Sequence, residues 1–401
     1  MARSHGVLLA VIALLASVLA QPAIAKTTLP APSVSFTKFA LTAGSVTGAA
    51  VRTSSGALEL SAGDQGSWLS PSQSAGLDFD ELVASWNATT PTGSWITIEM
   101  AATGSGRTTK WYTMGLWTSD PVPARRTSVS GQGDADGFVA IDTFVRSKKA
   151  APLNMYQLRV TLRRDPGAAT PNVRLVGAMT SATVAKYDMP SAPLHNALRD
   201  SLGVPSYSQE IHTGHFPEYD GGGEAWCSPT STAMILDFWG AGPSEGELAI
   251  FPATGEPDAQ VDYAARAVYD WNYQGAGNWP FNTAYAGARG LNGFVTRLRS
   301  LAEAERFIDV GIPLVASING RLPGFFFGKT NGHLLTIVGF TASGDVISND
   351  PAVPTDAGVH RTYGRADFEQ VWLGGSGGIV YVIYPSGKAL PANVDGLPHN
   401  W

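Results

Sequence analysis

The chain contains a single cysteine, Cys227, among its 401 residues. No disulfide can therefore form within it, and its fold must be stabilised by packed cores. The length exceeds what one hydrophobic core usually serves, and 44% hydrophobic with 15% charged residues is typical of globular proteins. We expect two domains, both folded.

The first 25 residues have the pattern of a secretory signal peptide. Arg3 supplies a positive start, residues 6–20 form an apolar run, and Ala-Ile-Ala at 23–25 is a small-x-small cleavage site. The apolar run is shorter than the roughly 20 residues that a spanning helix needs. The sequence predicts a secreted, extracellular protein whose mature chain starts at Lys26 and does not associate with a membrane after cleavage.

Charge and motifs exclude several classes of function. The net charge is −6 and no long basic run is present, which argues against nucleic acid as a partner. The sequence contains no phosphate loop, no dinucleotide fingerprint, no His-Glu-x-x-His and no Gly-x-Ser-x-Gly. We therefore expect no cofactor and no serine-hydrolase chemistry.

Residues 26–190 have the alternating and β-branched pattern of strands separated by Gly, Ser, Asp and Pro clusters, which predicts an all-β sandwich of jelly-roll type. The expected strands include 57–60, 95–100, 155–162 and 173–179. Such a domain is a possible binding domain for carbohydrate or a cell-wall polymer, because tryptophans stack on sugar rings. Core packing is the preferred interpretation of the tryptophans at 68, 86, 95, 111 and 117.

The prolines at 190 and 193 mark a boundary, and the pattern beyond them is α+β. We expect helices over 230–239, 260–269 and 293–310, and strands over 313–318, 334–340, 346–348 and 378–384. The second domain is placed at 191–401. Each half is expected to fold by itself.

Cys227 lies where a helix begins. Pro229 suits the first turn of a helix, and Ser228 and Thr230 are suited to capping its free amides. The N-terminal end of a helix favours the thiolate, the form of cysteine that attacks a carbonyl. A buried structural cysteine is the alternative, but an exported protein has little use for an idle thiol. We interpret Cys227 as reactive.

A base for this thiolate is available in His333, which begins a buried strand after a glycine turn. The next strand is predicted to return beside the first and ends at Asp350, whose carboxylate is then placed to orient the His333 ring. Each residue alone is weak evidence, but in combination with Cys227 they indicate nucleophilic catalysis.

The motifs that carry this chemistry resemble those of papain-like cysteine peptidases of the C39-like type. The matching segments are 204–209, 226–236 beginning Trp-Cys-Ser-Pro-Thr, 302–318, 332–340, Asn-Asp-Pro at 349–351 and 368–372. The resemblance implies a papain-like fold over 191–401, with Cys227 as nucleophile, His333 as general base and acid, Asp350 as orienting group and Gln209 in the oxyanion hole. The chain departs from the family by having Ser228 in place of glycine and a long loop, 210–226, before the cysteine.

Two segments near the predicted site have more than one interpretation. The loop carries His212 and His215 with nearby carboxylates, a set that can bind a metal, but a solvated loop without metal is preferred. The aromatic segment 241–291 either lines a substrate cleft or packs in the core, with Trp271, Tyr273, Trp279, Phe281, Tyr285 and Arg289 as its large side chains.

The predicted function is that of a secreted cysteine peptidase that hydrolyses peptide amide bonds through a thioester. Its partners would be peptide or protein substrates. The alternatives are a cell-wall peptide amidase or an acyltransferase using the same thiol, and an exported binding protein without activity.

Overall fold

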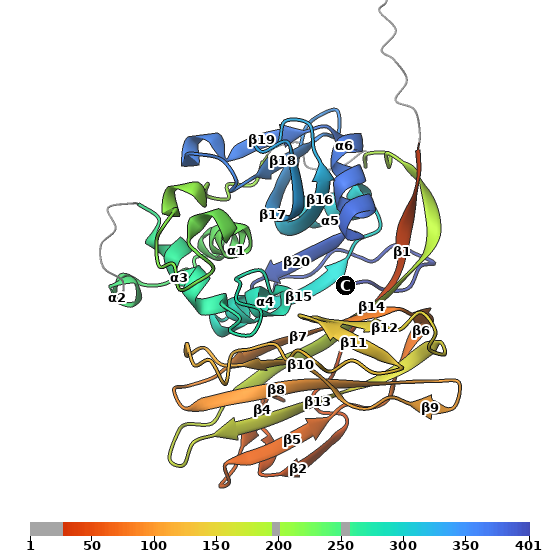
Figure 1. The fold of residues 1–401 in the computed structure, drawn as a ribbon, viewed down its shortest axis with the longest axis vertical. Coiled ribbons are helices and arrows are strands. Elements are labelled where there is room, and N and C mark those ends of the chain that lie inside the picture. Colours follow the sequence, from red (N-terminus) through yellow and green to blue (C-terminus); the bar gives the residue numbers. More distant parts are fainter. Residues whose placement is uncertain (1–26, 195–200, 250–256) are drawn as a thin grey trace, which may run out of the picture.

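The computed structural model describes residues 27–194, 201–249 and 257–401. An all-β N-terminal half is followed by a C-terminal half that mixes helices with one sheet (Figure 1). The predicted α+β fold class is confirmed. The predicted signal peptide, residues 1–25, lies outside the described residues.

The N-terminal half is a sandwich of two antiparallel sheets, each with seven strands. The first has the order β11-β12-β7-β14-β4-β3 with β1 paired to β14, and the second the order β10-β8-β13-β5-β2 with β6 on β13 and β9 on β8. The strands are β1 (Thr27–Lys38), β2 (Ser45–Gly48), β3 (Ala50–Arg52), β4 (Leu58–Leu60), β5 (Gln65–Leu69), β6 (Gln73–Phe79), β7 (Glu81–Thr89), β8 (Ser94–Gly104), β9 (Arg107–Thr108), β10 (Tyr112–Trp117), β11 (Gly137–Ala140), β12 (Thr143–Arg146), β13 (Leu153–Arg164) and β14 (Asn172–Met189).

The tryptophans of the sandwich serve mainly its core. Trp68, Trp86 and Trp117 are fully buried. Trp95 and Trp111 are half-buried, and each stacks against an arginine guanidinium, at 4.1 and 4.4 Å from the ring centroids. The preference for core packing therefore holds for three of the five.

The C-terminal half is built on a six-stranded antiparallel sheet of order β15-β20-β16-β17-β18-β19. Figure 1 shows α1, α3 and α4 on one side of this sheet and α5 and α6 on the other. The elements are α1 (Cys227–Phe238), α2 (Glu245–Leu248), α3 (Ala259–Val268), α4 (Trp279–Ala288), β15 (Asn292–Arg297), α5 (Leu301–Asp309), β16 (Leu314–Arg321), β17 (Lys329–Phe340), β18 (Val346–Asn349), β19 (His360–Tyr363), α6 (Arg365–Glu369) and β20 (Ile379–Tyr384).

The single helix expected over 293–310 is wrong. Residues 292–297 form β15, and the helix α5 begins only after Ser300, whose hydroxyl accepts a hydrogen bond from the N–H of Glu303. The apolar residues of β15 are buried on both faces, so their run lacks the alternation that would have marked a strand. A continuous buried run cannot be distinguished from a helix by periodicity alone.

The two halves meet where β15, an edge strand of the six-stranded sheet, lies against β7 of the sandwich (Figure 1). The side chain of Asn87 donates to the carbonyl of Gly293 (2.9 Å) and accepts from its N–H (3.0 Å). The hydroxyl of Ser85 accepts from the N–H of Val295 (2.9 Å). Side chains of the sandwich thus satisfy the backbone groups that an open sheet edge would leave unpaired.

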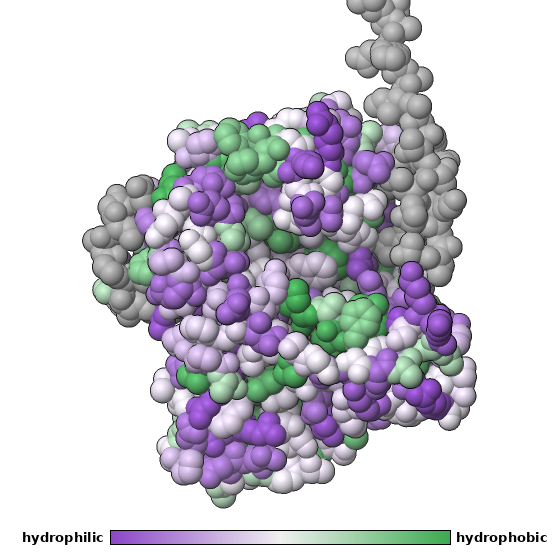
Figure 2. Space-filling view, viewed as in Figure 1, coloured by the Kyte–Doolittle hydropathy of each residue, from purple (hydrophilic) through white to green (hydrophobic). Residues whose placement is uncertain are grey.

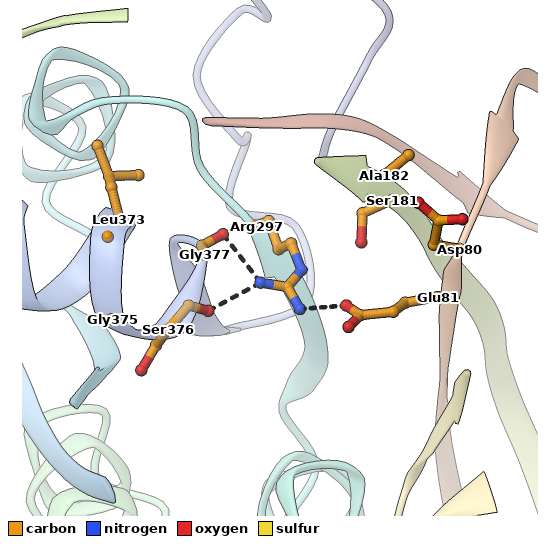
Figure 3. A pocket seen from close by; sticks show the side chains of 10 residues that line it. Asp80, Glu81, Ser181, Ala182, Arg297, Leu373, Gly375, Ser376 and Gly377 are labelled. Atoms are coloured by element: carbon orange, nitrogen blue, oxygen red, sulfur yellow. Dashed lines mark hydrogen bonds and ion pairs between the residues drawn. The ribbon is translucent and has the colours of Figure 1, made fainter. Parts of the chain in front are cut away.

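Charged groups add further contacts across this interface. Arg297 pairs with Glu81 and donates to the carbonyls of Ser376 and Gly377, as Figure 3 shows. On another part of the interface, the fully buried Arg126 of the sandwich donates to backbone carbonyls of the C-terminal half, and burial lowers its pKa to about 9. A buried charge with fixed partners makes this docking specific.

Apolar contacts complete the junction. The ring of Phe281 in α4 lies 6.1 Å from the ring of Trp86 and 5.3 Å from that of Trp117. Figure 2 shows apolar side chains along the seam between the halves. One continuous hydrophobic core spans both. The boundary near residue 190 stays a prediction, but the expectation that each half folds by itself did not foresee this shared core.

No helix among the described residues is long and apolar enough to cross a membrane.

Candidate active site

Cys227 is the first residue of α1 and is half-buried. The expected capping by Ser228 and Thr230 is wrong: the N-cap residue is Trp226, and no side chain caps the helix. The hydroxyl of Ser228 instead pairs with that of Tyr381 at 2.9 Å. The first N–H groups of a helix have no partner within it, so α1 presents its positive end to the thiol.

His333 and Asp350 come together through the pairing of β17 with β18. Thr336 is paired with Asn349 in this antiparallel ladder, so the next residue, Asp350, comes opposite Leu335 and lies diagonally from His333 on the same face of the sheet. Nε2 of His333 is 2.7 Å from Oδ1 of Asp350. This pairing leaves Nδ1 as the ring nitrogen for proton exchange. The spatial arrangement predicted from the two strands is therefore present.

Asp350 is fully buried and accepts several hydrogen bonds. Besides His333, the N–H of Ala352 donates to it at 3.0 Å, and the hydroxyl of Tyr363 donates to its other oxygen. Burial favours the neutral acid, but the charge of His333 and these hydrogen bonds outweigh it and lower the pKa of Asp350. Tyr363 was not singled out from the sequence, because it lies in β19, which no motif marked.

The surroundings of the His333 ring favour its cationic form. Burial alone would lower its pKa, but Asp350 and then Cys227 act against burial and raise the pKa to about 10. The Phe325 ring lies 5.1 Å from the imidazole, centroid to centroid, and covers it. The site therefore favours an imidazolium between a carboxylate and the sulfur.

Cys227 and His333 line a common cleft of about 560 Å³. Gln209 also lines it and is buried. The structure thus brings all four predicted site residues into one region: Cys227, His333 and Gln209 at the cleft and Asp350 directly behind His333.

The amide of Gln209 already has acceptors. Its Nε2 donates to the carbonyl of Glu224 at 2.7 Å and to Oε1 of Glu210 at 3.0 Å. Gly223 lies close to the backbone of Gln209: a Cβ at this glycine would be 2.2 Å from the backbone carbonyl oxygen of Gln209. Gln209 is thus fixed by the loop, and an oxyanion would have to replace the Glu210 carboxylate as its acceptor.

The aromatic segment divides between the two interpretations left open. Tyr273 and Trp279 line the cleft, whereas Phe281 and Tyr285 are buried in the core. Tyr273, Gly277 and Trp279 also line a neighbouring pocket of about 330 Å³, whose far wall belongs to the sandwich. The cleft at Cys227 therefore continues toward the N-terminal half.

Ile141 and Asp142 belong to that far wall. Ile141, in the turn between β11 and β12, has a φ of 61° and is 39% exposed. The carboxylate of Asp142 accepts from the N–H of Trp279 at 2.8 Å, and burial raises its pKa to about 6. A β-branched residue with positive φ is strained, and such strain concentrates at functional sites.

The loop 210–226 is not simply solvated. His212 is fully buried, His215 is half-buried, and both rings face Asp262 of α3, with Nδ1–Oδ1 distances of 3.1 and 3.2 Å. The expectation of a solvated surface loop that borders the cleft holds for Asp220, Glu224 and Ala225, which line the cleft, but it is wrong for the two histidines. Their partner Asp262 lies about fifty residues further along the chain, so the composition of the loop does not reveal it.

Comparisons with known proteins identify a family for both halves. Residues 35–181 match the model of the "Peptidase C39 N-terminal domain" and residues 201–378 that of the "Peptidase_C39 like family". The chain belongs to the C39-like peptidase family. The sandwich is thus the N-terminal domain known from this family, and the half with Cys227 is its peptidase domain.

Among solved structures, a chain described as a C39-like peptidase from Bacillus anthracis is similar at 15% identity and a TM-score of 0.29, over 48% of this chain and 98% of that chain. A chain from infectious bursal disease virus, Gt strain, is similar at 12% identity and a TM-score of 0.17, over 43% of this chain and 36% of that chain. No curated protein gave a match.

Proposed function

We propose that the protein is a secreted cysteine peptidase that uses Cys227, His333 and Asp350. The observation that carries the proposal is the placement of the Cys227 sulfur, at an uncapped helix start, beside a His333 ring whose other nitrogen is bound to Asp350. A thiolate with an adjacent imidazolium, oriented by a third group, is the arrangement of nucleophilic catalysis.

The reaction proceeds by acyl transfer. The sulfur of Cys227 attacks the carbonyl carbon of a peptide bond, and His333 donates its proton to the leaving amine as the C–N bond breaks. A water molecule then gives a proton to His333 and attacks the thioester, which releases the acid and the thiol. Asp350 keeps the ring in place through both steps.

The oxyanion of each tetrahedral intermediate needs hydrogen-bond donors. The N–H of Cys227 at the start of α1 is one candidate. The amide of Gln209 is the second, once the oxyanion takes the position that the Glu210 carboxylate holds at Nε2. The hydrogen bond to the Glu224 carbonyl would keep the amide oriented meanwhile.

The substrates we propose are peptides that extend beyond the scissile bond. The cleft at Cys227 shares Tyr273 and Trp279 with the pocket that the sandwich borders, so an extended chain can contact both halves. Secretion, carried by the predicted signal at residues 1–25, would place this activity outside the cell.

A peptide library treated with purified protein, with Cys227→Ala as the blank, tests the proposal. Wild type is expected to cleave, and the variant to lose turnover completely while its circular dichroism and Tm stay unchanged, because a half-buried thiol contributes little to packing. Cleavage by the verified variant would exclude Cys227 as nucleophile.

A further inference from the structure

Three side chains of metal-binding type converge at the base of the loop 210–226. His212 ends the short helix η1 (Glu210–His212), His215 follows three residues later, and Asp262 lies on α3. One ligand atom from each lies within 4.8 Å of the other two. None of the three is among the residues that line the cleft of Cys227.

The spacing of these atoms suits one ion. Nδ1 of His212 and Nδ1 of His215 are 3.1 and 3.2 Å from Oδ1 of Asp262. Two ligands bound at about 2.0–2.1 Å to a tetrahedral ion are separated by about 3.3 Å. Both rings therefore present a nitrogen to the same carboxylate oxygen at the separation that a shared ion requires.

Hydrogen bonding alone accounts for the cluster less well. The other ring nitrogen of His212, Nε2, is buried and has no hydrogen-bond partner among the described residues. A fully buried ring with an unsatisfied nitrogen is costly, and two hydrogen bonds to a single carboxylate oxygen recover only part of that cost. An ion bound to Nδ1 of both rings and to Oδ1 of Asp262 would replace these two hydrogen bonds with stronger coordinate bonds and so stabilise the three buried side chains, although Nε2 of His212 would stay without a partner among the described residues.

We propose that His212, His215 and Asp262 bind a divalent transition-metal ion of the zinc class. Two imidazoles and one carboxylate suit zinc and its neighbours, whereas calcium and magnesium require mostly oxygen ligands. His212 and Asp262 are shielded from solvent, and the side chain of His215 is 16% exposed, so the ion enters from the side of His215. A fourth position is left for water.

The ion would have a positioning role. It would link the loop to α3 between the two cleft residues that flank the loop, Gln209 before it and Cys227 after it. The ring of His212 lies 6.3 Å from that of Trp226, the residue before Cys227. Fixing His212 to α3 therefore restrains both ends of the loop.

Metal binding is measured on full-length protein that carries Cys227→Ala. The variant is needed because the Cys227 sulfur and the His333 ring could together bind zinc at the active site. Protein treated with a chelator and dialysed is titrated with Zn²⁺ by calorimetry and with Co²⁺ by visible absorption. We expect one equivalent bound at micromolar or lower Kd, and a Tm that rises by a few degrees with excess Zn²⁺.

His215→Ala and Asp262→Asn, each added to Cys227→Ala, should weaken binding by 100-fold or more and abolish the rise in Tm. His399→Ala is the matched control, since His399 is exposed and distant in sequence from the cluster. If Asp262→Asn fails to fold, the His215→Ala variant decides the result, because His215 is only half-buried. Absence of binding in Cys227→Ala, or unchanged binding in the His215 variant, would leave only a hydrogen-bonded cluster and overturn the proposal.

Discussion

The two halves use the same kinds of side chain for different ends. In the sandwich, large aromatic residues such as Trp68, Trp86 and Trp117 are buried in the core. In the C-terminal half, Tyr273 and Trp279 border the cleft that contains Cys227 and His333. The chemistry thus lies in one half, while the other covers its sheet edge and forms the far wall of the adjoining pocket. The halves share a hydrophobic core and a pocket, whereas all the candidate catalytic residues lie in the C-terminal half.

Removal of the sandwich gives the largest expected effect. Without residues 27–190, the backbone groups of β15 that Asn87 and Ser85 satisfy and the apolar face around Phe281 would be exposed. We expect residues 191–401 alone to be insoluble or to lack a cooperative thermal transition. This differs from the independent folding expected from sequence.

A point variant isolates the same interface. Asn87→Ala removes both hydrogen bonds to Gly293, and the loss of buried partners costs about 1–3 kcal/mol per group left unsatisfied. Asn154→Ala, on an exposed part of the sandwich, should change stability by less than about 0.5 kcal/mol. A truncated half that folds and cleaves peptides would show that the interface is dispensable.

Within the C-terminal half, the charge relation between His333 and Asp350 is the next test. His333→Ala should be nearly as damaging as loss of the thiol, whereas Asp350→Asn should lower kcat less, by about 10- to 100-fold, because an amide can still orient the ring. We expect the alkaline limb of the wild-type pH–rate profile near pH 10, where the imidazolium of His333 would lose its proton. It should move to lower pH in Asp350→Asn, since the charge that raises the pKa is removed.

The sign for stability follows from the same shift. The folded-state pKa of His333 is above its unfolded value of about 6.5. The stabilisation of the folded state by the His333 charge is therefore fully present below pH 6.5 and is lost as the pH rises toward about 10. Wild-type rates in His333→Ala would show that His333 is not the base of the reaction. A limb that does not move in Asp350→Asn would contradict the electrostatic role of Asp350.

Local sequence predicted that Cys227, His333 and Asp350 come together, but it did not predict what surrounds them. Cys227, His333 and Asp350 lie at ends of elements with clear helix or strand patterns, so their approach follows from antiparallel pairing. Tyr363, which bonds Asp350, and Asp262, which bonds His212, were missed because tertiary contacts bring them there from β19 and α3. No spacing rule connects residues that far apart along the chain.

The fold shows the same division. The alternation in β13 and β14 predicted strands of the sandwich, whereas β15 was taken for part of a helix because both of its faces are buried. One face of β15 packs against the sandwich, which its own residues cannot indicate. Local sequence patterns therefore do not show which surfaces of one half are buried by the other half.

Gln209 tests how far the loop takes part in catalysis. If its amide stabilises the oxyanion, Gln209→Ala should lower kcat by roughly 100-fold with little change in KM. Glu210→Ala is the matched variant: it removes the present acceptor of the amide and should not lower kcat. Steady-state kinetics on one peptide substrate measure both. A neutral Gln209 variant would assign the role to backbone N–H groups at the start of α1.

The smallest effect is expected at Ile141, where the comparison between the halves is most direct. Its positive φ costs stability, and glycine at this position should relieve the strain and raise stability by about 1 kcal/mol. If substrates reach the sandwich, Ile141→Gly should nonetheless raise KM a few-fold for peptides of about ten residues, because an apolar contact is lost, and leave the KM of tripeptides unchanged. Phe138→Ser is the control: this residue is 44% exposed in the same hairpin but does not line the pocket. Equal effects on long and short peptides, or the same change with the control, would confine substrate binding to the C-terminal half.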